Sequence, residues 1–178
     1  MRSRQEGLGR RRFLQAGLTG AAAGSILACG RSGGGAYWRF FSDPEAKTVG
    51  AICDRIIPAD GAPGASEAGV VNFIDLQLTK PYRKHQAAYR KGIAEVDAVS
   101  RDRFGKVFSE LSVEQQTEIL FDLEGNENEF FRLIRTHAMQ GFYGDPRHGG
   151  NRGAASWKMV ALPDPPVRGR VPYERKRG

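Results

Sequence analysis

Apolar residues recur at helical spacing in five separate segments of this 178-residue chain, and no stretch alternates apolar with polar residues as a half-buried strand would. Two of these segments open with a capping box, Ser-x-x-Glu from Ser42 and Ser-x-x-Gln from Ser112. The pattern predicts an all-α domain, a small bundle of about five helices over residues 42–143. The Gly- and Pro-rich residues 144–178 are predicted to be a long irregular segment.

The other helix boundaries follow from turn residues and from further capping residues. Pro58 is expected to end the first helix, and Ser66 to cap the second. A longer amphipathic helix is predicted over residues 82–100. Either Asn126 or Asn128 is expected to start the last helix, which leads into the irregular segment.

Three residues of these helices could carry chemistry, and a structural role is expected for each. Asp75 stands among apolar residues of the second helix, where a buried carboxylate needs a partner. A loop backbone or an arginine is the natural candidate. His137 and Cys53 each lie on an apolar helical face, so we expect a core histidine and a buried, unreactive thiol.

The formal charge of +7 is concentrated at the two ends of the chain. Residues 1–28 hold five arginines against one glutamate, and residues 168–178 hold five basic residues against one glutamate. Residues 29–167 are therefore left at −1. Since a nucleic-acid-binding domain carries a basic surface on its folded part, this distribution argues against nucleic acid as a partner.

Residues 1–28 have the anatomy of an export signal, with a charged start, a short apolar run and a small-residue end. Their Arg-Arg-x-Phe-Leu pattern resembles a twin-arginine signal, which exports folded proteins. The residues that carry this pattern are Arg10, Arg11, Phe13 and Leu14. The chain is therefore expected in the periplasm.

The stretch from Ile26 to Cys29 resembles a bacterial lipobox, in which Cys29 would become the lipidated first residue of the mature chain. Residues 29–41, rich in glycine, would then be a flexible tether that holds the domain at the membrane. The alternative is an ordinary signal cut near Ala28, which would leave Cys29 as a free thiol.

No catalytic motif is evident: the chain has no nucleophile elbow, phosphate loop or dinucleotide fingerprint. We expect no catalytic, cofactor-binding or metal-binding residue in this chain, and hence no enzyme activity of its own. Two alternatives remain open. A metalloenzyme would use Asp145 and His148, and a sugar-binding lipoprotein would use loop aromatics with Asp145, Asn151 and Arg152.

Two blocks of the sequence carry a resemblance to a known family. The first block runs from Ile56 to Asp75 and contains Ile-Ile-Pro-x-Asp, Pro-Gly-Ala and Glu-Ala-Gly-Val. The second reads Gly-Phe-Tyr-Gly-Asp-Pro-Arg-His-Gly-Gly-Asn from Gly141, with Trp157 and Lys158 beyond it. Together with the export signal, these blocks resemble the gluconate 2-dehydrogenase subunit 3 family, over roughly residues 42–165.

The resemblance implies partners rather than a reaction of this chain. In such complexes a large flavoprotein of the glucose-methanol-choline type holds FAD and oxidises a sugar or polyol, and a c-type cytochrome with haem c often takes the electrons. The small subunit escorts the flavoprotein through twin-arginine export and stays bound to it.

On this reading the Gly-rich loop and its aromatic residues dock on the partner, since buried aromatics dominate the binding energy of many interfaces. The residues expected to dock are Phe142, Tyr143, Asp145, Pro146, Arg147, Gly149, Gly150, Asn151 and Trp157. The alternative is that the loop folds back on its own helices as a structural plug.

Overall fold

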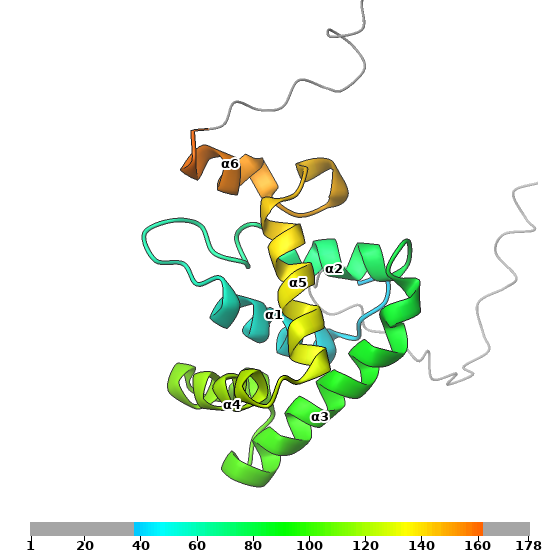
Figure 1. The fold of residues 1–178 in the computed structure, drawn as a ribbon, viewed down its shortest axis with the longest axis vertical. Coiled ribbons are helices and arrows are strands. Elements are labelled where there is room, and N and C mark those ends of the chain that lie inside the picture. The colour runs from blue at the N-terminus through cyan, green and yellow to red at the C-terminus, as the bar shows by residue number, and fades with distance from the viewer. Residues whose placement is uncertain (1–37, 162–178) are drawn as a thin grey trace, which may run out of the picture. The chain divides into compact units, whose positions relative to one another are not determined.

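The computed structural model describes residues 38–161, which form six α-helices and no strand (Figure 1). The helices are α1 (Asp43–Ile56), α2 (Val70–Leu78), α3 (Gln86–Phe104), α4 (Val113–Gly125), α5 (Glu129–Tyr143) and α6 (Ala155–Met159). The all-α prediction is therefore confirmed, and none of these described helices is long and apolar enough to cross a membrane. The predicted signal residues Arg10, Arg11, Phe13 and Leu14, the predicted lipidation site Cys29 and the basic tail lie outside the described residues.

Side-chain caps set the predicted starts of three helices. At α1, the backbone N–H of Ser42 donates to Glu45 Oε2 at 2.8 Å. At α4, the backbone N–H of Ser112 donates to Gln115 Oε1 at 3.1 Å, and the reciprocal bond completes the capping box. Asn128 caps α5, because its Oδ1 accepts from the N–H of Phe131 at 3.0 Å. Each cap satisfies backbone donors that the helix cannot satisfy internally.

The predicted cap of the second helix is wrong. The hydroxyl of Ser66 donates to Asp54 Oδ2 at 2.7 Å, so this side chain fastens the loop to α1 instead. Helix α2 begins four residues later at Val70, after Gly69, which adopts the left-handed conformation with φ 71°. The third helix also differs, since α3 starts at Gln86 and continues to Phe104 before Gly105 closes it.

Helix α5 is the centre of the bundle and contacts each of the other five helices (Figure 1). Its buried face carries Phe130, Ile134, Ala138 and Phe142 at four-residue spacing. Gly92 lets α3 approach this face, because a Cβ at that position would lie 2.0 Å from the ring of Phe130. The core therefore forms around one helix that leads directly into the Gly-rich loop.

Asp75, which is fully buried on α2, holds residues 39–41 where the chain leads into α1. Its carboxylate accepts three hydrogen bonds, from the backbone N–H groups of Arg39, Phe40 and Phe41, at 2.8–3.0 Å. The guanidinium of Arg39 lies 4.0 Å from the same carboxylate. The predicted partners of a buried Asp75, a loop backbone and an arginine, are thus confirmed.

Residues 144–161 are less irregular than predicted. They contain two 3-10 turns, Pro146–His148 and Arg152–Ala154, and the five-residue helix α6. Asn151, Gly153 and Ala154 have positive φ, so the backbone reverses between these short pieces. A helix as short as α6 gives no apolar periodicity to detect, which is why the sequence pattern missed it.

Candidate functional site

The loop segment, residues 144–157, joins the end of α5 to α6 and was the strongest candidate site in the sequence. Two side chains of α2 bind the backbone of the loop segment. Asn72 Nδ2 donates to the carbonyl of Gly149 at 2.7 Å, and Gln77 Nε2 donates to the carbonyl of His148 at 3.1 Å. Two helix side chains therefore fix the middle of the loop segment through its backbone.

Asn151 closes the loop segment on itself. Its side chain is fully buried, Nδ2 donates to the carbonyl of Gly144 at 2.9 Å, and Oδ1 accepts from the N–H of Ser156 at 3.0 Å. The residue has φ 44°, a left-handed conformation that asparagine tolerates better than most residues. One amide thus ties the beginning of the loop segment to its end.

The two neighbouring glycines are required by close packing within the chain. At Gly150, a Cβ would lie 2.2 Å from the carbonyl oxygen of Gly141 and 3.1 Å from Cβ of Phe73. Gly149 has φ 97° and packs against Asn72. These glycines allow the loop segment to lie directly on α2 and α5.

Asp145 and Arg147 satisfy each other at the exposed edge of the loop segment. Asp145 Oδ1 accepts from the backbone N–H of Arg147 at 2.9 Å, and Oδ2 accepts from its Nε at 2.9 Å. The hydrogen bonds from the Arg147 side chain and backbone lower the pKa of Asp145 to about 2. Asp145 is therefore a carboxylate at neutral pH and unsuited to donate a proton.

The three aromatics that were expected to dock have different positions. Phe142 is 1% exposed and belongs to the core of the domain, so it does not present its ring to a partner in this conformation. Tyr143, the next residue, is 51% exposed. Trp157 is half-buried, and its Nε1 donates to the carbonyl of Tyr143 at 3.0 Å.

The plug interpretation therefore describes much of the loop segment. Phe142, Gly150 and Asn151 are buried against the chain itself, and Arg147 pairs with Asp145 instead of standing free for an acidic group elsewhere. Among the residues that were expected to dock, Tyr143 and Arg147 are exposed. Asp145, Pro146, Gly149 and Trp157 are half-buried.

A second polar cluster is buried between α3 and α5, around His137. The ring of His137 stacks on Tyr82 with centroids 4.0 Å apart, and its Nδ1 lies 3.0 Å from the hydroxyl of Tyr89. Burial lowers the pKa of His137 to about 4, and the nearby His85 contributes in the same direction. The prediction of a hydrogen-bonded core histidine is confirmed.

These arrangements leave little polar chemistry at the loop segment. Both ends of the Asn151 amide are engaged, which removes one of the three side chains expected to take sugar hydroxyls. Asp145, the second, is held by Arg147. Within residues 38–161, no group of three or more His, Cys, Asp or Glu side chains is arranged to hold a metal ion.

The sequence interpretation missed Asn72 and Gln77, which position the loop segment. The argument used for Asp75 could have identified them: a polar side chain among the apolar residues of a helix needs a buried hydrogen-bond partner. The same reasoning applied along α2 would have predicted that three polar side chains bind other parts of the backbone.

Comparison with known proteins gives one match. The model of the family described as gluconate 2-dehydrogenase subunit 3 matches residues 43–163, which span all six helices. No curated protein and no solved structure matches the chain.

Proposed function

The chain belongs to the gluconate 2-dehydrogenase subunit 3 family, and from that premise we propose that it is a non-catalytic accessory subunit of a periplasmic sugar or polyol dehydrogenase complex. Its partner is a flavoprotein subunit of the glucose-methanol-choline type, which holds FAD and carries out the oxidation. A c-type cytochrome subunit is the second partner and receives the electrons. The cofactors belong to those subunits.

The observation that carries this proposal is the family match, because it covers the described helical domain from α1 to α6. The internal use of polar groups also supports it. Asp75, Asp145 and His137 each serve the fold of this chain through hydrogen bonds to its own groups. Residues so engaged suit a subunit that acts by binding.

The escort role rests on the terminal sequence. Arg10, Arg11, Phe13 and Leu14 form the twin-arginine pattern, and this pathway requires its cargo to fold before export. We propose that the flavoprotein binds this chain in the cytoplasm and crosses with it. Lipidation at Cys29 would then hold the complex at the membrane through the Gly-rich tether.

Co-expression with the candidate flavoprotein, followed by cell fractionation, tests the proposal. The chain is compared with a variant in which Arg10 and Arg11 are both changed to Lys. We expect the flavoprotein to co-purify with the chain and to reach the periplasm only with the intact arginine pair. Export of an active flavoprotein without this chain would overturn the escort role.

A further inference from the structure

A groove on the outer side of α4 and α5 is open and is lined by large apolar side chains. Its volume is about 250 Å³, and it lies where the end of α1 meets α4 and α5. Six of its residues define what we call the Phe121 groove: Arg55, Ile56, Leu120, Phe121, Phe131 and Arg135. This surface shares no residue with the loop segment.

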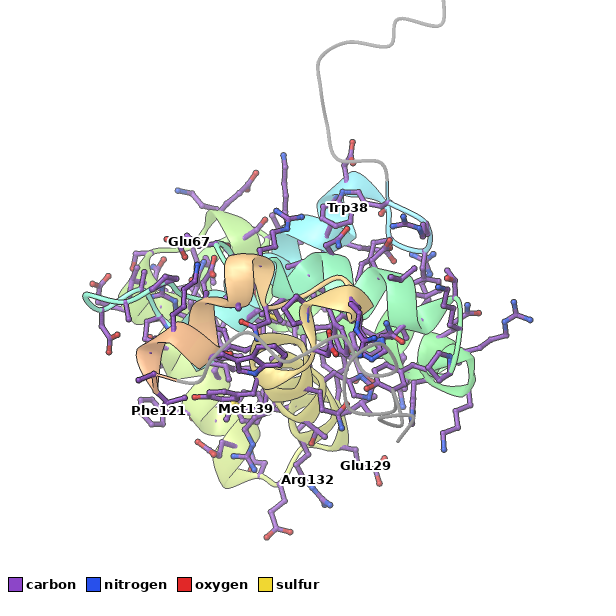
Figure 2. All side chains as sticks on the ribbon, turned by 90° about the horizontal axis from the view of Figure 1, so that it is seen from above. Trp38, Glu67, Phe121, Glu129, Arg132 and Met139 are labelled. Atoms are coloured by element: carbon purple, nitrogen blue, oxygen red, sulfur yellow. The ribbon has the colours of Figure 1, made fainter. Side chains whose placement is uncertain are left out.

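The floor and the rim of the Phe121 groove differ in burial. Leu120 and Phe131 form the floor and are 6% exposed, so they belong to the core. Phe121 stands on the rim and, at 67%, is the most exposed large hydrophobic residue in residues 38–161. Figure 2 shows the side chain of Phe121 projecting from the edge of the domain. Together with the apolar floor, this exposed ring gives the groove apolar surface that a partner could bury.

The charged residues of the groove indicate what the occupant must carry. Arg135 is paired with Glu124, with 2.6 Å between Nη1 and Oε1. By contrast, no hydrogen-bond acceptor among residues 38–161 reaches the buried Nε of Arg55. The Nε itself is covered by the chain, so an occupant meets the rest of the Arg55 side chain, which lines the groove. A carboxylate on the occupant would gain a charge-assisted hydrogen bond to this guanidinium.

We propose that the Phe121 groove is where the flavoprotein subunit docks, by inserting one large apolar side chain next to a carboxylate that binds Arg55. This inference rests on the proposed function, since membership in a subunit family implies a permanent partner. Charge decides against the chain's own tail as the occupant, because residues 168–178 hold five basic residues against one glutamate. Placing that tail beside Arg55 would bring like charges together.

The test measures binding of the full chain to the purified flavoprotein subunit, with three single variants. Phe121→Ser removes the apolar rim, and Arg55→Met keeps the length of the side chain but removes its donors. Val113→Ser is the matched control, since Val113 is 50% exposed on the same helix and lies outside the groove. We expect the first two variants to weaken binding by about tenfold or more, and the control by less than about twofold.

Each other outcome has a defined meaning. Wild-type affinity in Phe121→Ser would overturn the groove as the docking site and leave the proposed function standing. A concentration-dependent dimer of the chain alone that Phe121→Ser abolishes would identify a second copy as the occupant. The tail would be identified as the occupant if deleting residues 162–178 lowered the thermal stability of the wild-type chain but not that of the Phe121→Ser variant. No binding by the wild-type chain would overturn the proposed function itself.

Discussion

The loop segment and the Phe121 groove differ in how their polar groups are used. In the loop segment, Asn151 is bonded at both ends of its amide, and Asp145 is held by Arg147. In the groove, the Nε of Arg55 has no acceptor among the described residues, and Phe121 is largely exposed. The loop segment also has one buried atom without a partner, the Oγ of Ser156, so the two regions differ mainly in apolar exposure. The loop segment packs on the chain itself, whereas Phe121 of the groove stands exposed.

This difference shows that an unusual composition and an available surface are separate properties. The glycines and aromatics of the loop segment meet the needs of its own packing, because Gly150 and Phe142 lie against α5 and the core. The groove is built from ordinary helix residues. A binding surface is recognised by the apolar surface that stays exposed after folding, rather than by how distinctive its sequence is.

Among the variants of the loop segment, Gly150→Ala is expected to lower the stability of the chain most. The added Cβ would lie 2.2 Å from the carbonyl oxygen of Gly141, so the loop segment must move away from α5. We expect the free energy of unfolding to fall by about 3 kcal/mol or more, measured by urea denaturation. Gly125→Ala is the control, since nothing lies within 4 Å of its Cβ and no loss is expected. Equal stability of the two variants would show that the loop segment is not closed on α5.

The free energy of unfolding of the chain should fall at acid pH because of His137, which is buried on α5. Because folding lowers the pKa of this residue from 6.5 to about 4, the unfolded chain binds its proton first as the pH falls. Stability is therefore fully present above pH 6.5 and is lost toward pH 4, by roughly 3 kcal/mol at the lower end. Denaturation curves at several pH values measure this loss.

The double variant Tyr89→Phe, His137→Phe removes both partners of the buried hydrogen bond, whose atoms lie 3.0 Å apart. We expect its stability to change much less between pH 6.5 and pH 4, because the titrating group is gone. Tyr89→Phe alone should keep the dependence on pH. An unchanged dependence in the double variant would assign the effect to another residue.

Trp157→Ala tests whether this half-buried side chain serves the fold of the chain, the binding of the partner, or both. The chain alone loses the hydrogen bond from Nε1 to the carbonyl of Tyr143, which we expect to cost about 1 kcal/mol in thermal unfolding. If the exposed side of Trp157 also docks, affinity for the flavoprotein falls while the monomer stays folded. An unfolded monomer would instead make Trp157 part of the plug.

The smallest effect on stability is expected at the open region. Phe121→Ser should change the free energy of unfolding of the chain alone by about 0.5 kcal/mol or less, because this side chain is 67% exposed. Leu120→Ala, at the neighbouring buried position, should cost about 3 kcal/mol. Similar losses in the two variants would show that Phe121 packs in the core.

Local signals predicted the fold well where one short stretch decides the structure. The capping residues at Ser42, Ser112 and Asn128 act within three positions of themselves, so the sequence alone identified the first two and gave Asn128 as one of two candidates. Asp75 was also identified, since a carboxylate among apolar residues demands a partner. Ser66 was misassigned because Asp54, twelve residues earlier, competes successfully for its hydroxyl.

The positions of the site residues were less accessible to sequence reasoning. The four-residue register of α5 from Phe130 would have placed Phe142 inside and Tyr143 outside, had the helix been extended to its true end. The Phe121 groove has no local signature, because its walls come from three helices. It exists only after packing brings residues 55–56, 120–121 and 131–135 together.

The way Asp75 holds the entering chain has a mechanical consequence. Whatever pulls on the residues before Trp38 first meets the three hydrogen bonds that this carboxylate accepts, before α1 begins at Asp43. The ring of Phe41, which is 5% exposed and packs against Tyr89, must leave the core in the same step. Residues 38–41 are therefore held by these hydrogen bonds and by core packing together. A force on this end of the domain is thus resisted by α2 and the core before α1 unwinds, and Asp75→Asn, which weakens the hydrogen bonds, should lower the force at which residues 38–41 detach.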